Sequence, residues 1–260
     1  MKTLSLVFPC YNEREGIEHL LGRLDDTQRA LRSEYVLELI FVDDGSVDGT
    51  ADRLEAGCRD RFDARVIRHD KNRGLGAALR TGFAHTTGQL IATTDSDCTY
   101  DPRELVPMLR LLERGADVVV GSAYHPLGAV RNVPAYRLFL SRNLSRLYSR
   151  VLGVKLYTYT GLMRLYRADV LRAVRFESDD FLAVAEILVG ALRLGFHVVE
   201  HPMPLTVRRY GTSKAVILRL IRDHAWFLWK LKRDGVRVSH HANEPIEVSV
   251  GDGAPSHPPV

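Results

Sequence analysis

Short apolar runs rich in β-branched residues alternate with helical patterns through the first 120 residues, and this alternation restricts the fold more than any other feature. The predicted strands are 3–8, 37–42, 65–68, 90–94 and 118–120. The predicted helices are 15–31, 50–59, 76–85 and one that begins at Pro102, after the capping residue Asp101. Such alternation predicts an α/β fold, a Rossmann-like and mostly parallel sheet covered by helices on both faces.

Polar residues follow three of these strands, at 9–13, 43–46 and 95–97. In parallel α/β sheets, ligands bind beyond the carboxyl ends of the strands. The three segments are therefore the first candidates for a binding site.

The second half is less regular. Helices are predicted at 136–152, at 181–194 before Gly195, and at 215–232. The last is amphipathic and contains Trp226 and Trp229, so it either packs on the sheet or lies on an anionic lipid surface. Residues 234–260 are rich in His, Pro, Ser and Gly and are expected to form a disordered tail.

The charge is unevenly distributed. From Val118 to Ala168 there is no acidic residue, although the net charge of the chain is only +4. The cations of this stretch are Arg131, Arg137, Arg142, Arg146, Arg150, Lys155, Arg164 and Arg167. The asymmetry indicates an anionic partner, such as phosphate groups or a lipid surface, although a solvated basic face would give the same pattern. No nucleic-acid partner is expected.

Cysteine usage and hydropathy suggest the compartment. Cys10, Cys58 and Cys98 are widely spaced, which argues against a zinc site or a disulfide framework and fits a reducing compartment. We expect no signal peptide, and the apolar run 225–229 is far shorter than the ~18 residues that span a bilayer. A cytoplasmic protein is expected, with a peripheral position at the inner face of the cytoplasmic membrane as the alternative.

Asp95 and Asp97 follow a predicted strand directly, separated by Ser96. Two carboxylates at this spacing, where the chain turns, can bind one hard cation such as Mg²⁺ or Mn²⁺. The cation would bridge diphosphate oxygens and neutralise charge on a departing nucleotide. Two solvated loop acids would give the same motif, if it is taken alone.

The second acidic strand end is Val42-Asp43-Asp44-Gly45-Ser46. Asp44 could accept hydrogen bonds from a base or a ribose, whereas Ser46 or Asp48 could simply cap the next helix. The glycines at 74 and 76 open a helix, but their pattern is not a dinucleotide fingerprint. No phosphate-binding loop ending in Gly-Lys-Ser/Thr is present, which argues against an ATPase or a kinase.

Taken in order, the motifs resemble the inverting family 2 glycosyltransferases with a GT-A fold. They are Pro9-Cys10-Tyr11-Asn12-Glu13, Val42 to Ser46, Asn72 with Gly74, Gly76 and Gly82, and Asp95-Ser96-Asp97. Glu186, Gly195, Glu200-His201-Pro202 and Arg208 to Lys214 resemble the branch of dolichyl-phosphate mannose synthase and the bacterial polyprenyl-phosphate glycosyltransferases. The resemblance covers roughly residues 1 to 233.

The resemblance implies roles for individual residues. Pro9, Tyr11, Glu13, Val42 and Asp44 would surround the nucleoside of a nucleotide-diphosphate sugar. Asp95, Ser96 and Asp97 would line the diphosphate, with the metal on Asp95 and Asp97. Arg208 and Lys214 would contact phosphates, unless they are surface cations of a loop, and Arg137 would lie near the acceptor phosphate.

The chain differs from the family pattern at three positions. Thr99 stands where relatives often carry Gln as a further metal ligand, and Ala123 where Arg commonly follows Gly-Ser. Thr158 stands where relatives usually carry Asp. The differences leave the donor site intact and concern the acceptor.

The expected function is metal-dependent transfer of a hexose, with inversion, from a donor of the GDP-mannose or UDP-glucose type to a polyprenyl or dolichyl phosphate. A hydroxyl acceptor would need a base, for which Glu186 or an Asp of the 179–180 pair is the candidate, although Glu186 could be a helix-surface carboxylate. A catalytically silent nucleotide-binding module or a nucleotidyltransferase would also fit a nucleotide-binding α/β chain.

The expected organisation is one glycosyltransferase domain at 1–233. Its nucleotide-sugar half is 1–121, its acceptor half is 122–214, and the amphipathic helix is 215–233.

Overall fold

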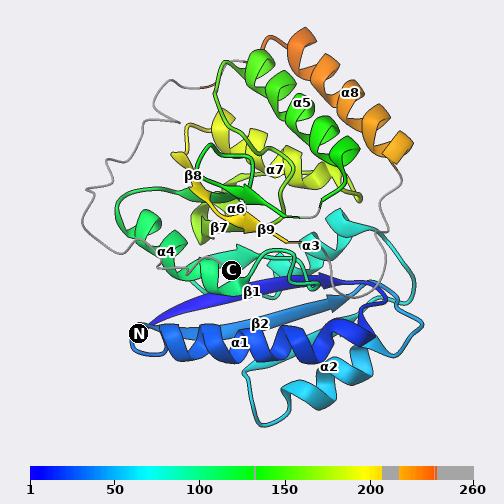
Figure 1. The fold of residues 1–260 in the computed structure, drawn as a ribbon, viewed down its shortest axis with the longest axis vertical. Helices are drawn as coiled ribbons and strands as arrows, with labels where there is room; N and C mark the ends of the chain where they lie inside the picture. Colours follow the sequence, from blue (N-terminus) through cyan, green and yellow to red (C-terminus); the bar gives the residue numbers. More distant parts are fainter. Residues whose placement is uncertain (132, 207–216, 237, 239–260) are drawn as a thin grey trace.

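A seven-stranded sheet forms the centre of the computed structural model, which describes residues 1–131, 133–206, 217–236 and 238 (Figure 1). The strands of this sheet are β1 (Lys2–Cys10), β2 (Tyr35–Asp43), β3 (Ala64–Arg68), β4 (Leu90–Thr93), β5 (Val118–Ser122), β7 (Arg164–Arg167) and β8 (Val198–Pro202). Two further strands, β6 (Ala129–Val130) and β9 (Pro204–Leu205), form a separate two-stranded sheet. The helices are η1 (Arg14–Gly16), α1 (Ile17–Leu31), α2 (Thr50–Cys58), α3 (Leu75–Ala84), η2 (Pro102–Glu104), α4 (Leu105–Glu113), α5 (Ala135–Leu152), α6 (Ala168–Ala173), α7 (Leu182–Arg193) and α8 (Ile217–Arg233).

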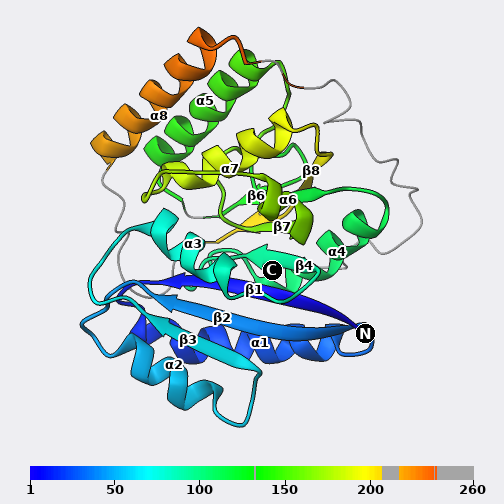
Figure 2. The same cartoon turned by 180° about the vertical axis from the view of Figure 1, so that it is seen from behind.

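The strand order is β3-β2-β1-β4-β7-β5-β8, and all neighbours are parallel except β7, which is antiparallel to β4 and β5. Both faces of the sheet are buried. Leu6 and Phe8 of β1 belong to the core beneath α1, α2 and α4, whereas Val7 belongs to the core shared with α3, α5, α7 and α8 (Figures 1 and 2). The predicted two-sided α/β sheet is thereby confirmed.

The five predicted strands and the first-half helices are present, with shifts of one or two residues at their ends. Asp101 caps η2 through a hydrogen bond from the Arg103 backbone N–H to its side chain. Five elements were not predicted: the short helix α6, β7 within the sheet, β8 at its edge, and the two-residue strands β6 and β9, which pair with each other.

Strand β7 was missed because its four residues include two arginines. Arg164 is fully buried, and its guanidinium donates to the backbone oxygens of Tyr159 and Val184. Arg167 donates to the backbone oxygens of Ala116 and Leu112. Two cations of the acid-free stretch therefore stabilise the fold, and the buried Arg164 is not available to an anionic partner.

Helix α8 packs beside α5, and both lie on the α7 side of the sheet (Figures 1 and 2). Phe227, Leu228 and Leu231 of α8 are buried, and His224 accepts or donates a hydrogen bond of 2.7 Å with the Tyr148 hydroxyl of α5. Trp226 and Trp229 are more than half exposed. One stripe of the helix therefore packs in the core, and a second stripe faces outwards.

The sheet combines strands from both expected halves of the chain, since β7 and β8 lie beyond residue 121. Apart from 234–236 and 238, the expected disordered tail lies outside the described residues.

Candidate active site

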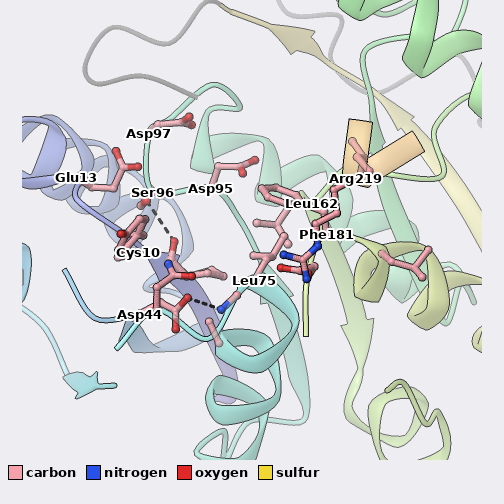
Figure 3. A pocket seen from close by; sticks show the side chains of 18 of the residues that line it. Cys10, Glu13, Asp44, Leu75, Asp95, Ser96, Asp97, Leu162, Phe181 and Arg219 are labelled. Carbon is pink, nitrogen blue, oxygen red and sulfur yellow. Dashed lines mark hydrogen bonds and ion pairs between the residues drawn. The ribbon is translucent and has the colours of Figure 1, made fainter. Parts of the chain in front are cut away.

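A cavity of about 510 Å³ lies at the carboxyl ends of β1 and β4. Its walls come from seven parts of the chain: the end of β1 and the segment after it, the residue after β2, the start of α3, the segment after β4, the residue Leu162 before β7, the loop before α7 with the start of α7, and α8. Figure 3 shows Glu13, Cys10 and Asp44 on one side and Phe181 and Arg219 on the other, with Asp95 between them. The strand-end prediction therefore located the cavity correctly.

The cavity is strongly acidic. Its described lining includes the carboxylates of Glu13, Asp44, Asp95, Asp97, Asp180 and Asp223. Among the same described lining residues, Arg219 is the single Lys, Arg or His side chain. A cavity with this balance favours cations, and an anionic ligand needs a compensating positive charge to enter it.

The segment that carries Asp95 and Asp97 forms a turn, which is held by one hydrogen bond to β1 and one within the turn. The Ser96 hydroxyl donates to the Pro9 backbone oxygen at 3.3 Å, and Asp97 Oδ1 accepts the Thr99 backbone N–H at 3.0 Å. Between them Cys98 has a positive φ of 54°. The turn places both carboxylates on the cavity wall, close to the end of β1.

The electrostatics of this turn suit a cation. Burial, together with the nearby carboxylates of Asp97 and Asp101, raises the pKa of the Cys98 thiol to about 12. Oxygen ligands in a negative environment are what Mg²⁺ and Mn²⁺ prefer. Within the described ranges no three His, Cys, Asp or Glu side chains form a metal cluster. A metal on Asp95 and Asp97 would therefore complete its coordination with phosphate oxygens and water, which fits the chemistry of this donor set.

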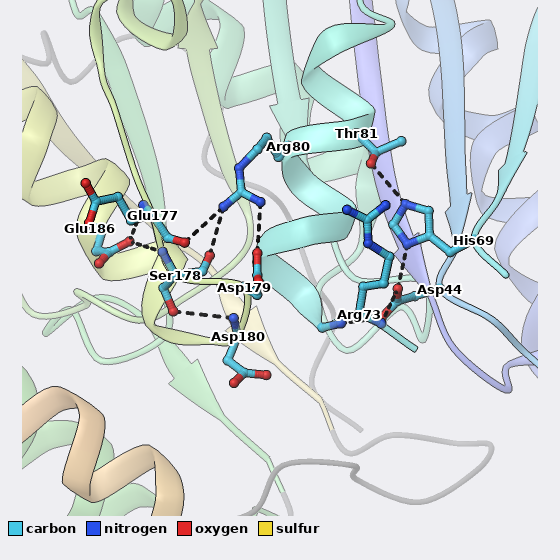
Figure 4. A network of polar contacts seen from close by, with 11 residues as sticks. Asp44, His69, Arg73, Arg80, Thr81, Glu177, Ser178, Asp179, Asp180 and Glu186 are labelled. Carbon is cyan, nitrogen blue, oxygen red and sulfur yellow. Dashed lines mark hydrogen bonds and ion pairs between the residues drawn. The ribbon is translucent and has the colours of Figure 1, made fainter. Parts of the chain in front are cut away.

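Asp44 holds in place the loop at residues 72–74, which contributes Asn72 and Gly74 to the cavity lining; its contacts are drawn in Figure 4. Its Oδ1 accepts the Arg73 backbone N–H at 2.9 Å, and its Oδ2 accepts the Gly74 N–H at 2.8 Å. His69 Nδ1 lies 2.7 Å from Asp44 Oδ1, and His69 Nε2 lies 2.9 Å from the Thr81 hydroxyl. Asp44 thus both lines the cavity and positions its glycine loop.

His69 was not predicted, although the sequence held a signal for it. The residue directly follows β3, and polar residues after parallel strands are the ones expected at a binding edge. The interpretation in which Ser46 or Asp48 caps the next helix holds only in part: neither residue is the N-cap, but Asp48 Oδ1 accepts the backbone N–H of Thr50, the first residue of α2, at 3.0 Å. The N-cap of α2 is Gly49, which has a φ of 86° and makes no side-chain cap bond.

Most residues assigned to the donor lie together. Pro9, Tyr11, Glu13, Asp44, Asp95, Ser96 and Asp97 all line the cavity. Val42 does not: it is fully buried, lies opposite Pro9 in the sheet and belongs to the core. Arg208 and Lys214 lie outside the described residues.

The two residues assigned to the acceptor side lie elsewhere. Arg137 is exposed on α5, and its Nε donates to the Tyr136 hydroxyl at 3.2 Å. Glu186 of α7 does not line the cavity, and its Oε2 accepts the backbone N–H groups of Glu177 and Ser178 at 3.0 and 2.9 Å. Glu186 therefore holds the loop that leads to Asp180, and its role as a base stays a prediction.

Thr158 belongs to a buried polar cluster away from the cavity lining. Its hydroxyl lies 2.8 Å from that of Ser122, and its backbone N–H donates to Glu200 at 2.8 Å. Burial raises the pKa of Glu200. The Glu200-His201-Pro202 motif therefore supplies a structural carboxylate at the edge strand β8.

Two known proteins are similar in sequence to this chain over about four fifths of its length. Polyprenol monophosphomannose synthase of Mycolicibacterium smegmatis is 36% identical over 219 residues, which cover 80% of this chain and 79% of that protein. Dolichol-phosphate mannosyltransferase of Pyrococcus furiosus is 29% identical over 215 residues, or 81% of this chain and 58% of that longer protein.

A solved structure confirms the fold. Glucosyl-3-phosphoglycerate synthase from Mycobacterium tuberculosis, in complex with Mn²⁺, uridine diphosphate and glucosyl-3-phosphoglycerate, superposes with a TM-score of 0.64. The match is 22% identical and covers 90% of this chain and 80% of that one. At this identity the likeness establishes the GT-A type fold alone.

The family model described as glycosyl transferase family 2 matches residues 5–175. This match spans every segment of the cavity that precedes the loop before α7. The chain therefore belongs to glycosyl transferase family 2 and is a glycosyltransferase.

Proposed function

We propose that the protein moves a hexose, with inversion, from a nucleotide-diphosphate sugar of the GDP-mannose or UDP-glucose type to a polyprenyl or dolichyl phosphate. The observation that carries the proposal is the acidic turn after β4, where Asp95, Ser96 and Asp97 face the cavity beside Tyr11 and Glu13. The names of the mannose synthase relatives support the polyprenyl phosphate acceptor.

The donor site separates two tasks. Pro9, Tyr11, Glu13 and Asp44 would surround the nucleoside on one side of the cavity, and Asp95 and Asp97 would hold Mg²⁺ or Mn²⁺ beside the diphosphate. When bound, such a cation neutralises the charge that develops on the leaving nucleoside diphosphate. The buried Asp44 contacts keep the glycine loop in place before the donor arrives, so little ordering remains to be done on binding.

The acceptor determines whether a base is required. A phosphate monoester is largely ionised near neutral pH, so its oxygen can attack the anomeric carbon without losing a proton to the enzyme. The new bond joins the anomeric carbon to the acceptor oxygen, while the bond to the donor diphosphate breaks. The protein then contributes alignment and charge stabilisation. Glu186 accepts two backbone hydrogen bonds away from the cavity lining and is therefore poorly placed as a base, so Asp180, which lines the cavity, is the candidate base if the acceptor is a hydroxyl.

The test is a donor screen. GDP-mannose and UDP-glucose are each incubated with Mg²⁺ or Mn²⁺, with and without undecaprenyl phosphate, and nucleoside diphosphate release is measured. Release that needs both metal and lipid phosphate is expected. Release stimulated only by a sugar or another hydroxyl compound would replace the acceptor, and no release with any donor would favour the silent module.

We also propose that α5 and α8 rest on an anionic lipid surface. Phe139 of α5 and Trp226 and Trp229 of α8 are 69%, 55% and 56% exposed, and Arg142 and Arg146 of α5 are exposed too. Aromatic side chains with flanking cations suit the headgroup region. No helix in the described ranges is long and apolar enough to cross a bilayer. Flotation with vesicles containing phosphatidylglycerol is expected at low salt, and its absence there would refute the proposal.

Arg208, Lys214 and Arg137 stay proposed phosphate contacts. The proposed division of the domain is a donor half at 1–121, an acceptor half at 122–214 and a lipid-facing helix at 215–233, which also supplies Arg219, Leu220 and Asp223 to the cavity.

A further inference from the structure

Arg219 occupies a particular place in the cavity. It is the single cationic side chain of the described lining, which also carries six carboxylates. It comes from α8, far along the chain from the nucleoside residues, and lies on the opposite side of the cavity from Glu13 and Asp44 (Figure 3). A cation there is poorly placed for the nucleoside and well placed for a second, anionic substrate.

The guanidinium of Arg219 is held by an ion pair. Its Nη2 lies 2.5 Å from Asp180 Oδ2, and its Nε lies 3.8 Å from Asp223 Oδ2. The Arg219 side chain is nevertheless 60% exposed, and that of Asp180 is 33% exposed. An ion pair this open to solvent contributes little net stability, so a stronger anion can displace Asp180 at small cost.

The loop that carries Asp180 is fixed more firmly than the arginine (Figure 4). Glu186 accepts two backbone N–H groups of the loop, and Arg80 of α3 pairs with Asp179 at 2.9 Å. The Gly76 backbone N–H also donates to the Asp179 backbone oxygen at 2.7 Å. Asp180 is therefore a fixed carboxylate, whereas Arg219 is a long, exposed side chain that can turn towards another partner.

We infer that Arg219 binds the phosphate group of the acceptor, and that Asp180 occupies the guanidinium until that phosphate arrives. The inference rests on the proposed function and specifies its acceptor site. A guanidinium forms bidentate bonds to a phosphate, and a phosphate monoester carries more negative charge than one carboxylate. Exchange of Asp180 for the phosphate therefore favours the phosphate. Asp95 and Asp97 would hold the metal that balances the donor diphosphate, whereas Arg219 balances the acceptor.

The first experiment measures binding rather than turnover. Farnesyl phosphate and farnesol are titrated against the full chain without added divalent metal, so that a bound metal cannot hold the phosphate. The wild type is expected to bind farnesyl phosphate at least tenfold more tightly than farnesol, and Arg219→Gln to lose most of that preference. Equal binding of the two compounds by the wild type, or an unchanged preference in Arg219→Gln, would overturn the inference.

Arg222→Gln is the matched control. Arg222 is an exposed guanidinium on the same helix, outside the cavity lining, and also pairs with Asp223, at 2.8 Å. It should retain the preference for farnesyl phosphate, whereas a loss equal to that of Arg219→Gln would assign the effect to the overall charge of α8. Arg219→Lys should restore part of the preference, because a lysine keeps the charge without the bidentate geometry. Circular dichroism of each variant shows that the fold is kept.

Asp180→Asn tests the exchange itself. Removing the competing carboxylate is expected to tighten farnesyl phosphate binding severalfold, while Asp169→Asn, at an exposed aspartate that pairs with Arg172 outside the cavity lining, should not. No tightening in Asp180→Asn would overturn the exchange.

Two further measurements separate the sources of phosphate and the two proposals. Binding of GDP or UDP with Mg²⁺ should change less than twofold in Arg219→Gln; a loss confined to the nucleoside diphosphate would move Arg219 to the donor and overturn the acceptor assignment. Failure of the proposed function would show separately, as a wild type that transfers no sugar to undecaprenyl phosphate while the farnesyl phosphate titrations keep their pattern.

Discussion

His69→Ala should weaken binding of the donor, because His69 contacts Asp44 and Asp44 holds the glycine loop of the cavity. His69 makes two hydrogen bonds, to the Asp44 carboxylate at 2.7 Å and to the Thr81 hydroxyl at 2.9 Å, and its side chain is 5% exposed. A bond to a charged group contributes about 1.5–3 kcal/mol and a neutral one about 0.5–1.5 kcal/mol. The variant should therefore lose roughly 2–4.5 kcal/mol of unfolding free energy. Because Asp44 holds the backbone at Arg73 and Gly74, the KM for the donor should also rise.

Urea denaturation and donor kinetics together measure these two effects. Thr81→Ala is the matched control, since it removes only the neutral bond and should cost about 1 kcal/mol without changing the donor KM. His85→Ala, at an exposed histidine whose ring nitrogen lies 2.8 Å from the Thr81 backbone oxygen, should leave the donor KM unchanged. If His69→Ala lowered stability as predicted but left the donor KM at the wild-type value, Asp44 would not transmit the loss to the loop. A stability loss below about 0.5 kcal/mol would refute the hydrogen-bond argument itself.

Three further predictions concern other parts of the molecule. Asn at Asp95 or Asp97 should reduce metal-dependent donor turnover by roughly 100-fold or more and weaken Mn²⁺ binding measured by calorimetry. Ala at Gly76 should cost about 1–3 kcal/mol in thermal unfolding, because its Cβ would lie 2.1 Å from a backbone oxygen of the loop before α7, whereas Ala at Gly22, with open space around it, should stabilise by about 0.5–1 kcal/mol. Burial lowers the pKa of His224 to about 4, so the unfolded chain binds the proton first as pH falls. About 3 kcal/mol of stability should disappear between pH 6.5 and 4 relative to His224→Gln, and parallel pH profiles of the two proteins would contradict this.

The first half of the fold followed from the sequence because its strands are buried on both faces. Leu6, Val7 and Phe8 are all fully buried, so the strand appears as a continuous apolar run. Strand β7 gives no such signal, because its buried Arg164 is satisfied by carbonyl oxygens from Tyr159 and Val184. Those partners come from a loop and from α7, and local patterns carry no information about them.

The residues of the cavity also fall into two groups, those that the local sequence pattern predicts and those whose position depends on distant packing partners. Asp44, Asp95 and Asp97 were predicted because they follow strands whose ends must meet at one edge of the sheet. Arg219 and Asp180 approach that edge from a helix and a loop whose positions depend on packing against α5 and α3. The cavity wall that we propose for the donor was therefore accessible from the sequence, and the opposite wall required the structure.

Helix α8 connects this opposite wall with the exposed surface. Arg219 lies at the cavity and Trp229 stands ten residues later, which at 1.5 Å per residue is about 15 Å along the helix axis. The phosphate and the lipid tail of one acceptor would thus meet different parts of the same helix. Trp226→Ala with Trp229→Ala should reduce flotation with anionic vesicles and leave farnesyl phosphate binding unchanged, while Arg219→Gln should do the reverse. Loss of both properties in both variants would mean that α8 acts only as a structural support for the cavity.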